Sequence, residues 1–162
     1  GEIMHSLLLS LCILLPDALP ASKRQAKMVC RYEKTIFKEA ARRNVDPYLL
    51  TSLIYVESAF RPRVVSHAGA CGLTQVIPKW TGGRETGGKR YTCKQLKEPR
   101  IAIGVGAQIL SYVTSNYAKG NINQGLCYYN AGNKCITRKY FYKKLNYVKK
   151  VRQVWNTIIG RH

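Results

Sequence analysis

The chain has 162 residues and a hydrophobic content of 46%, which fits one globular domain with a real core and excludes a disordered protein. Its formal net charge of +19 is extreme and favours an anionic partner, such as nucleic acid, an anionic membrane or a bacterial wall polymer. No zinc finger, basic zipper or other nucleic-acid motif accompanies the charge, so specific binding to nucleic acid is not expected.

The first 21 residues differ in composition from the rest. Residues 5–15 are nearly all apolar, Pro16 and Ala18-Leu-Pro-Ala21 follow, and every Lys and Arg comes later. This pattern predicts a secretory leader over 1–21, cleaved after Ala21, before a domain over 22–162. The apolar run is too short to span a membrane comfortably. Since no basic residue precedes it, a helix buried in the domain is the alternative.

Without those 21 residues the chain keeps 27 basic and six acidic side chains, a net charge of +21. A leader would place this body outside the cytoplasm, in the periplasm or the extracellular space, and a phage or virion setting would suit it as well. An anionic cell-envelope surface would attract it over a distance that shortens as salt is added.

Residues 28–44 predict an amphipathic helix that turns an apolar side inward and a basic side outward. The next helix starts at Asp46-Pro47, a capping side chain followed by a proline at the first helical position. Its apolar stripe consists of Leu49, Leu50, Leu53 and Ile54.

Glu57 follows Leu53 by four residues and Ile54 by three, so it falls on the inward face of this helix. Burial raises the pKa of a carboxyl, and a carboxylic acid still protonated near neutral pH can protonate the leaving oxygen of a glycosidic bond. The alternative is a helix-end carboxylate turned to solvent, as most Glu residues are.

Residues 64–92 show no clean period and predict loops, with one helical turn near residues 73–79. Within them Thr81–Gly88 holds four glycines and predicts an exposed, flexible loop. It does not match a phosphate-cradling motif.

Pro99 opens another helix, in which Gly106 predicts close contact between helices. A shorter helix runs from about Asn121 to Gly132, whose glycine suits a C-terminus. The last helix is predicted from about Tyr140 to Gly160. Together these elements predict an all-α domain of five or six helices, with a glycine-rich loop region after the helix that carries Glu57.

Six cysteines are present, with no Cys-x-x-Cys pair and only scattered histidines, so neither a metal nor a cofactor is expected. In an exported chain disulfides are expected, and the local pairs Cys71–Cys93 and Cys127–Cys135 are the first choice. Removal of a leader would leave five cysteines and therefore one odd thiol.

Four short segments are more informative together, in their order along the chain, than each is alone. They are Glu57-Ser58, Gly72-Leu-Thr-Gln75, Tyr128-Tyr129-Asn130-Ala-Gly132 and Tyr147-Val148. Singly each has an ordinary explanation: loop hydrogen bonding for Gln75, and packing or capping at a helix end for Tyr129 and Asn130. Together they resemble the motifs of the soluble lytic transglycosylases, relatives of goose-type lysozyme, over residues 36–155. The chain departs from the family pattern at Thr74, Ala102 and Tyr128.

The resemblance implies a lysozyme-like fold, a monomer, and cleavage of the MurNAc–GlcNAc β-1,4 bond in the glycan strands of peptidoglycan. In that family one glutamate first protonates the leaving oxygen. It then takes the proton of the muramyl C6 hydroxyl, which closes on C1 to give a 1,6-anhydro end.

Carried over residue by residue, the resemblance makes Glu57 the catalytic acid and base. Ser58 would orient the glutamate or the substrate. Gln75 and Asn130 would contact the sugar or its N-acetyl group, and Tyr129 and Tyr147 would flank the acid and form hydrogen bonds near it.

A glycosidase with two carboxylates needs a second Asp or Glu across the sugar, and only Glu85 and Glu98 follow Glu57. Glu98 precedes Pro99 and suits a helix N-terminus, whereas Glu85 lies in the glycine-rich loop. The sequence therefore favours a mechanism with one carboxylate. Two alternatives stay open: a goose-lysozyme-like muramidase that uses Glu85 for hydrolysis, and a non-catalytic basic module that binds wall or nucleic acid.

Overall fold

The computed structural model describes residues 11, 12, 15, 19 and 23–160. The leader predicted over 1–21 therefore lies mostly outside the described residues and stays a prediction. Of that stretch, Leu11, Cys12, Leu15 and Leu19 are described, and the three leucines are buried in a core cluster that includes residues of the first long helix.

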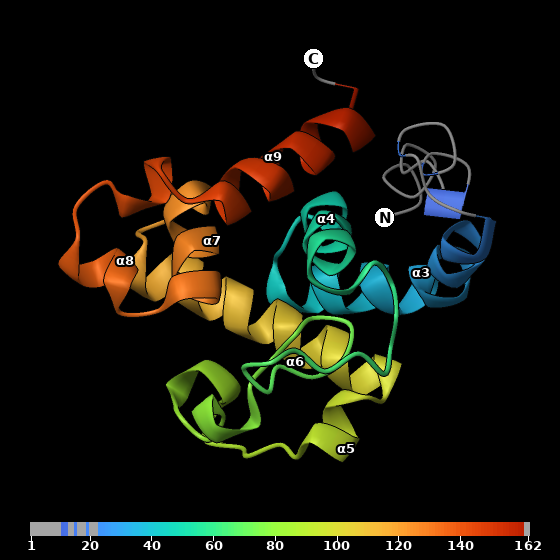
Figure 1. The fold of residues 1–162 in the computed structure, drawn as a ribbon, viewed down its shortest axis with the longest axis horizontal. Helices are drawn as coiled ribbons and strands as arrows, with labels where there is room; N and C mark the ends of the chain where they lie inside the picture. The colour runs from blue at the N-terminus through green and yellow to red at the C-terminus, as the bar shows by residue number, and fades with distance from the viewer. Residues whose placement is uncertain (1–10, 13–14, 16–18, 20–22, 161–162) are drawn as a thin grey trace.

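The described chain is helical, as predicted (Figure 1). Its α-helices are α3 (Lys23–Arg43), α4 (Pro47–Ser58), α5 (Cys93–Leu96), α6 (Pro99–Tyr112), α7 (Ile122–Ala131), α8 (Lys134–Thr137) and α9 (Asn146–Ile158). Single 3-10 turns lie at η1 (Pro78–Trp80), η2 (Arg84–Thr86) and η4 (Phe141–Lys143), and α6 continues into a π-helical turn, η3 (Val113–Tyr117). Within these residues the only β-pairing is two isolated bridges at Cys71.

Helix α4 lies at the centre of the molecule and packs against α3 and α9 (Figure 1). Leu50 and Ile54 join one core cluster, shared with α3 and α6, while Leu49 and Leu53 join another, shared with α7 and α9. This burial on two sides explains why α4 is apolar nearly all round.

Both ends of α4 are fixed locally. The Asp46 carboxylate accepts hydrogen bonds from the main-chain N–H groups of Tyr48, at 2.7 Å, and Leu49, at 3.1 Å, which confirms the predicted cap. Ala59 and Phe60 then take positive φ angles of 50° and 59°, which end the helix directly after Ser58. Glu57 is therefore held in the last turn of a buried helix.

The predicted start of the last helix was wrong. Residues between Gly132 and Asn146 form α8 and η4 instead of continuing one helix from Tyr140. Tyr140 itself has a positive φ of 65°, which a continuous helix excludes. The sequence period was too weak there to reveal two short turns.

Gly106 does mark a close approach, but its neighbour is a loop and not a helix. A Cβ atom at Gly106 would lie 2.4 Å from the Cγ2 atom of Thr74. The prediction of a close contact at Gly106 was therefore confirmed, but the contact is with the loop residue Thr74 and not with another helix.

Disulfides join Cys71 to Cys93 and Cys127 to Cys135, as predicted. A third bond joins Cys12 to Cys30 on α3, so all six cysteines, each among the described residues, are paired. The first two bonds tie the glycine-rich region to its own stem and α8 to α7.

The glycine-rich segment is less exposed than its composition predicts. Thr81 and Thr86 are 4% and 3% exposed. The Thr86 hydroxyl accepts from the Gly82 N–H at 2.9 Å and donates to the Lys89 carbonyl at 2.8 Å. These two threonines satisfy main-chain groups that the glycines leave without a regular partner, which gives the segment a fixed shape.

Candidate active site

Glu57 occupies a partly buried position at the C-terminal end of α4. Burial raises the pKa of its carboxyl from 4.5 to about 8, and the Tyr147 hydroxyl opposes part of that rise. The carboxyl is consequently protonated at neutral pH, the state that a general acid requires.

Tyr147 approaches Glu57 from α9 and is buried. The Tyr147 hydroxyl lies close enough to Glu57 to lower the pKa of that carboxyl. It forms no well-aligned hydrogen bond with any of the described residues. Two effects raise the pKa of Tyr147 well above its usual value: burial, which is the larger, and the nearby Glu57 carboxyl. The Tyr147 hydroxyl therefore stays protonated and remains a donor facing the acid.

Tyr129 approaches from α7. Its hydroxyl donates a 2.7 Å hydrogen bond to the main-chain carbonyl of Thr74, at the end of the loop that follows α4. Burial and the Glu57 carboxyl together raise the pKa of Tyr129 well above its usual value, so Tyr129 also stays neutral beside the acid.

Gln75 follows Thr74 and adopts a positive φ of 52°. Its amide nitrogen donates to the carbonyls of Val64, at 3.1 Å, and Gly72, at 2.9 Å. Gln75 therefore braces the loop that carries Thr74, which is the ordinary role considered for it from the sequence.

Ser58 and Asn130 are placed differently from the tyrosines. Ser58 is 1% exposed, and its hydroxyl donates to the carbonyl of Ile54 in the preceding turn. This position does not open the Ser58 hydroxyl to a sugar, and the orienting role expected for Ser58 stays a prediction. Asn130 is exposed at the end of α7, directly after Tyr129.

Of the six residues singled out from the sequence, the structure brings three close together around one carboxyl: Glu57, Tyr129 and Tyr147. Gln75 is linked to them indirectly, because the Tyr129 hydroxyl binds the neighbouring residue.

A row of tyrosines beside this group was missed. Tyr117, in the π-helical turn, has its ring centroid 5.6 Å from that of Tyr112 and 5.4 Å from that of Tyr128. Its hydroxyl donates to a Glu85 oxygen at 3.1 Å, and partial desolvation, together with Glu85 and Tyr112, raises the pKa of Tyr117 to about 12, although the side chain is exposed. The signal was the density of Tyr after residue 111, without a regular spacing that would have marked a face.

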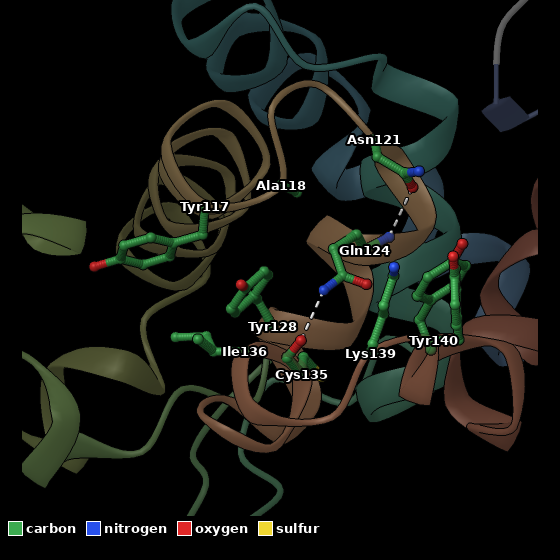
Figure 2. Close-up of a pocket in the computed structure, with 10 residues that line it drawn as sticks. Tyr117, Ala118, Asn121, Gln124, Tyr128, Cys135, Ile136, Lys139 and Tyr140 are labelled. Atoms are coloured by element: carbon green, nitrogen blue, oxygen red, sulfur yellow. Dashed lines mark hydrogen bonds between the residues drawn. The ribbon is translucent and has the colours of Figure 1, made fainter.

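A cavity of about 450 Å³ opens next to this row (Figure 2). Tyr117 and Tyr128 lie on one of its sides, and Gln124, whose amide donates to the Cys135 carbonyl at 2.8 Å, forms part of its wall. Glu57 is not among the residues that line the cavity. The cavity is therefore not built around Glu57.

Glu85, the carboxylate that a hydrolytic mechanism would use, accepts the Tyr117 hydrogen bond and lines a second cavity of about 210 Å³. The pKa of Glu57 responds to burial and to Tyr147, with no contribution from another carboxylate. Two carboxyls that share a site raise one another's pKa strongly, so no other carboxyl among the described residues shares the position of Glu57.

Neither a metal site nor a membrane span emerges from the described residues. They contain no group of three or more His, Cys, Asp or Glu side chains able to hold a metal ion. No helix among them is both long and apolar enough to cross a bilayer.

Residues 34–151 match the family model described as the transglycosylase SLT domain. The chain is 28% identical over 135 residues to membrane-bound lytic murein transglycosylase C of Actinobacillus pleuropneumoniae serotype 5b, a match that covers 76% of this chain and 37% of that protein. It is 29% identical over 137 residues to the protein of the same name from Haemophilus influenzae strain PittGG, covering 77% and 38%. The chain thus spans less than two-fifths of the length of these relatives.

Two solved structures are similar in fold. The 70 kDa soluble lytic transglycosylase Slt70 of Escherichia coli gives a TM-score of 0.68 at 21% identity, over 80% of this chain and 24% of that one. An inactive mutant of the lytic transglycosylase Slt of Pseudomonas aeruginosa gives 0.63 at 23% identity, over 88% and 25%. At these identities the likeness concerns the fold, which agrees with the predicted lysozyme-like class.

Proposed function

Because the chain belongs to the transglycosylase SLT domain family, we propose that it is a peptidoglycan lytic transglycosylase. It cleaves the MurNAc–GlcNAc β-1,4 bond and leaves a 1,6-anhydromuramyl end, with Glu57 as the only acid and base. The observation that carries the proposal is the Glu57 carboxyl, whose pKa of about 8 keeps it protonated at neutral pH.

In the first step Glu57 gives its proton to the bridging oxygen as the bond from the muramyl C1 to that oxygen breaks. In the second step the resulting carboxylate accepts the proton of the muramyl C6 hydroxyl while that oxygen forms a bond to C1. The carboxyl is thereby restored and no water is consumed. One group can serve as acid and then as base because its pKa lies near the operating pH.

The neighbouring tyrosines support this cycle from fixed positions. Between the two steps Glu57 is a buried anion, and the Tyr147 hydroxyl is the donor placed to stabilise it. Tyr129 keeps the Thr74 loop beside the acid through its 2.7 Å hydrogen bond. Asn130 is exposed and free to contact an N-acetyl group, while Gln75 shapes the loop.

The decisive experiment is mass spectrometry of peptidoglycan sacculi digested by the protein. We expect 1,6-anhydromuramyl ends, and reducing ends alone would instead establish hydrolysis. Glu57→Gln keeps the volume of the side chain but cannot donate the proton, so it should abolish lysis while the fold is retained. Near-normal turnover by this variant would refute the proposal.

A goose-lysozyme-like muramidase is the second candidate, and the partly exposed Glu85 carboxylate is the observation that keeps it in play. Glu85→Gln separates the two mechanisms, because only hydrolysis needs this group. A non-catalytic basic module remains the third candidate, and it would bind wall or nucleic acid tightly without lysis.

For the setting, we propose an exported, monomeric enzyme of the periplasm or extracellular space, with a phage or virion source compatible with the same domain. Its net charge of +19 supports attraction to an anionic envelope surface. The N-terminal sequence of the purified native protein tests export, since cleavage after Ala21 would give a chain that begins at Ser22.

A further inference from the structure

The positive charge of the protein is concentrated most regularly on α3. Its exposed basic side chains recur every three or four residues along the whole helix, and we call them the basic face: Arg24, Lys27, Arg31, Lys34, Lys38 and Arg42. At about 100° per residue all six fall within an arc of about 80°, and at about 1.5 Å per residue they extend over about 27 Å. The helix therefore carries roughly one cation per turn in a single line.

The basic face points away from the protein interior. The core side of α3 consists of Val29, Tyr32, Ile36 and Ala40, which lie on the opposite side of the helix and are all buried. Its packing partners are α4 and α6, and α3 lies at the edge of the molecule opposite α7 and α8 (Figure 1).

One acidic side chain pairs with the end of this line. Arg42 and Glu39 form an ion pair at 3.8 Å, with the Arg42 side chain 63% exposed. Like charges three or four residues apart destabilise a helix slightly, and α3 keeps five successive pairs of this kind. An outside anion would relieve that repulsion.

We infer that the basic face docks the protein onto the phosphate headgroups of an anionic lipid membrane. A straight line of cations on a convex helix can meet a plane at all six positions at once. Each Lys or Arg brought near such a surface adds to the attraction. The inference rests on the proposed envelope setting but not on the proposed catalysis.

A nucleic acid fits the basic face less well. The phosphates of a duplex follow a curved path, so a straight helix meets only part of them. Apart from the six cations, the exposed side chains described on α3 are Cys30, held in a disulfide, and Ala41. None of these exposed side chains is an Asn, Gln, Asp or Glu of the kind that pairs with adenine or cytosine in the major groove. The face also lacks an exposed aromatic or large apolar side chain, so docking is electrostatic and reversible.

The test is co-sedimentation with vesicles of phosphatidylcholine, with and without anionic phosphatidylglycerol. The triple variant Arg31→Gln/Lys34→Gln/Lys38→Gln removes the middle of the basic face. A matched control, Lys94→Gln/Arg100→Gln/Lys150→Gln, removes the same charge from exposed sites outside α3. At roughly fivefold in affinity per charge, the triple variant should bind anionic vesicles on the order of 100-fold more weakly than the unmodified protein.

We expect the control to lose much less, and pure phosphatidylcholine to bind none of the proteins. Equal losses in the two variants would overturn the inference, because net charge alone would then explain binding. A triple variant that loses affinity for a DNA duplex but keeps its affinity for vesicles would overturn it too.

Two readouts keep the result separate from catalysis and from folding. Glu57→Gln should bind vesicles as the unmodified protein does, so loss of lysis and loss of docking are distinguishable. Thermal melting should show the triple variant folded, with a midpoint equal to or above that of the unmodified protein, since repulsion on α3 is reduced. If it does not fold, the single change Lys34→Gln should still weaken vesicle binding about fivefold, and unchanged binding would refute the docking.

Discussion

The Tyr129 hydroxyl and the Thr74 main-chain carbonyl are joined by a 2.7 Å hydrogen bond between residues 55 positions apart in the sequence. Thr74 is fully buried, and its own hydroxyl donates to the Ala102 carbonyl of α6 at 2.6 Å. One residue thus connects α6, α7 and the loop that follows α4. The position of Tyr129 beside Glu57 depends on where Thr74 lies.

Gly106→Ala tests this dependence. Its added methyl group would lie 2.4–2.8 Å from the side-chain atoms of Thr74, so the loop must move. We expect a loss of about 1–3 kcal/mol in the free energy of unfolding, measured with urea, and a loss of lytic activity larger than the stability change explains.

Gly104→Ala, two residues earlier in α6, is the matched control. There the new methyl group meets only the end of the flexible Glu39 side chain, at 3.3 Å. Because alanine favours a helix over glycine, this variant should be neutral or more stable by up to about 1 kcal/mol. Equal destabilisation by both variants would show that Thr74 is not a tight contact.

The stability of the protein should depend on the titration of Glu57. Its pKa is about 8 in the folded protein and 4.5 when unperturbed, so the folded state binds one more proton between these pH values. The free energy of unfolding therefore falls as pH rises through this window, with a slope from this group of at most about 1.4 kcal/mol per pH unit.

Glu57→Gln removes the contribution of Glu57 to the pH dependence of the free energy of unfolding. At pH values near and above neutrality it should be more stable than the unmodified protein, and the difference should vanish below about pH 4.5, where the carboxyl is protonated in both states. Thermal melting across pH measures it. A difference that stays constant with pH would contradict the buried, protonated state of the acid.

Tyr147→Phe should alter the pH profile of lysis. The Tyr147 hydroxyl lowers the pKa of Glu57, so its removal raises that pKa further. We expect the alkaline limb of the activity profile to move to higher pH, while the maximal rate falls because the carboxylate loses its donor. Tyr142→Phe, on η4, is the control and should leave both unchanged. A Tyr147→Phe profile that moves to lower pH would be incompatible with this arrangement.

The Cys71–Cys93 bond should contribute strongly to stability, since it closes a loop with a sequence separation of 22. Loop-closure entropy predicts a loss of about 3 kcal/mol for Cys71→Ala/Cys93→Ala, measured by urea unfolding. The shorter Cys127–Cys135 loop, with a separation of 8, should cost less when it is opened in the same way. The reverse order would show that strain or packing, and not chain entropy, decides the effect.

The sequence predicted what depends on local pattern. The Asp46 cap, the apolar stripe of α4 and the inward position of Glu57 all follow from spacing along one helix. The two local disulfides were predicted because the two cysteines of each pair flank one loop.

What the sequence did not predict depends on contacts between distant segments. Gly106 faces Thr74 across 32 positions, and the hydroxyl of Tyr117 finds Glu85 across the same separation. Thr81 and Thr86 looked exposed because glycine-rich composition says nothing about which main-chain groups their hydroxyls satisfy. Ser58 shared a motif with Glu57, yet its hydroxyl turned to its own helix.

The stem of the glycine-rich segment is closed twice, by the Cys71–Cys93 bond and by Gly72, where any side chain would collide with the Leu96 carbonyl. Residues 78–91, which lie between these anchors and beyond Thr74, can change in length or composition without pulling on Glu57 at the end of α4. Segments borrowed from relatives should therefore be interchangeable here, so that the contacts proposed along a glycan strand could diversify while Glu57, the proposed acid, stayed where it is.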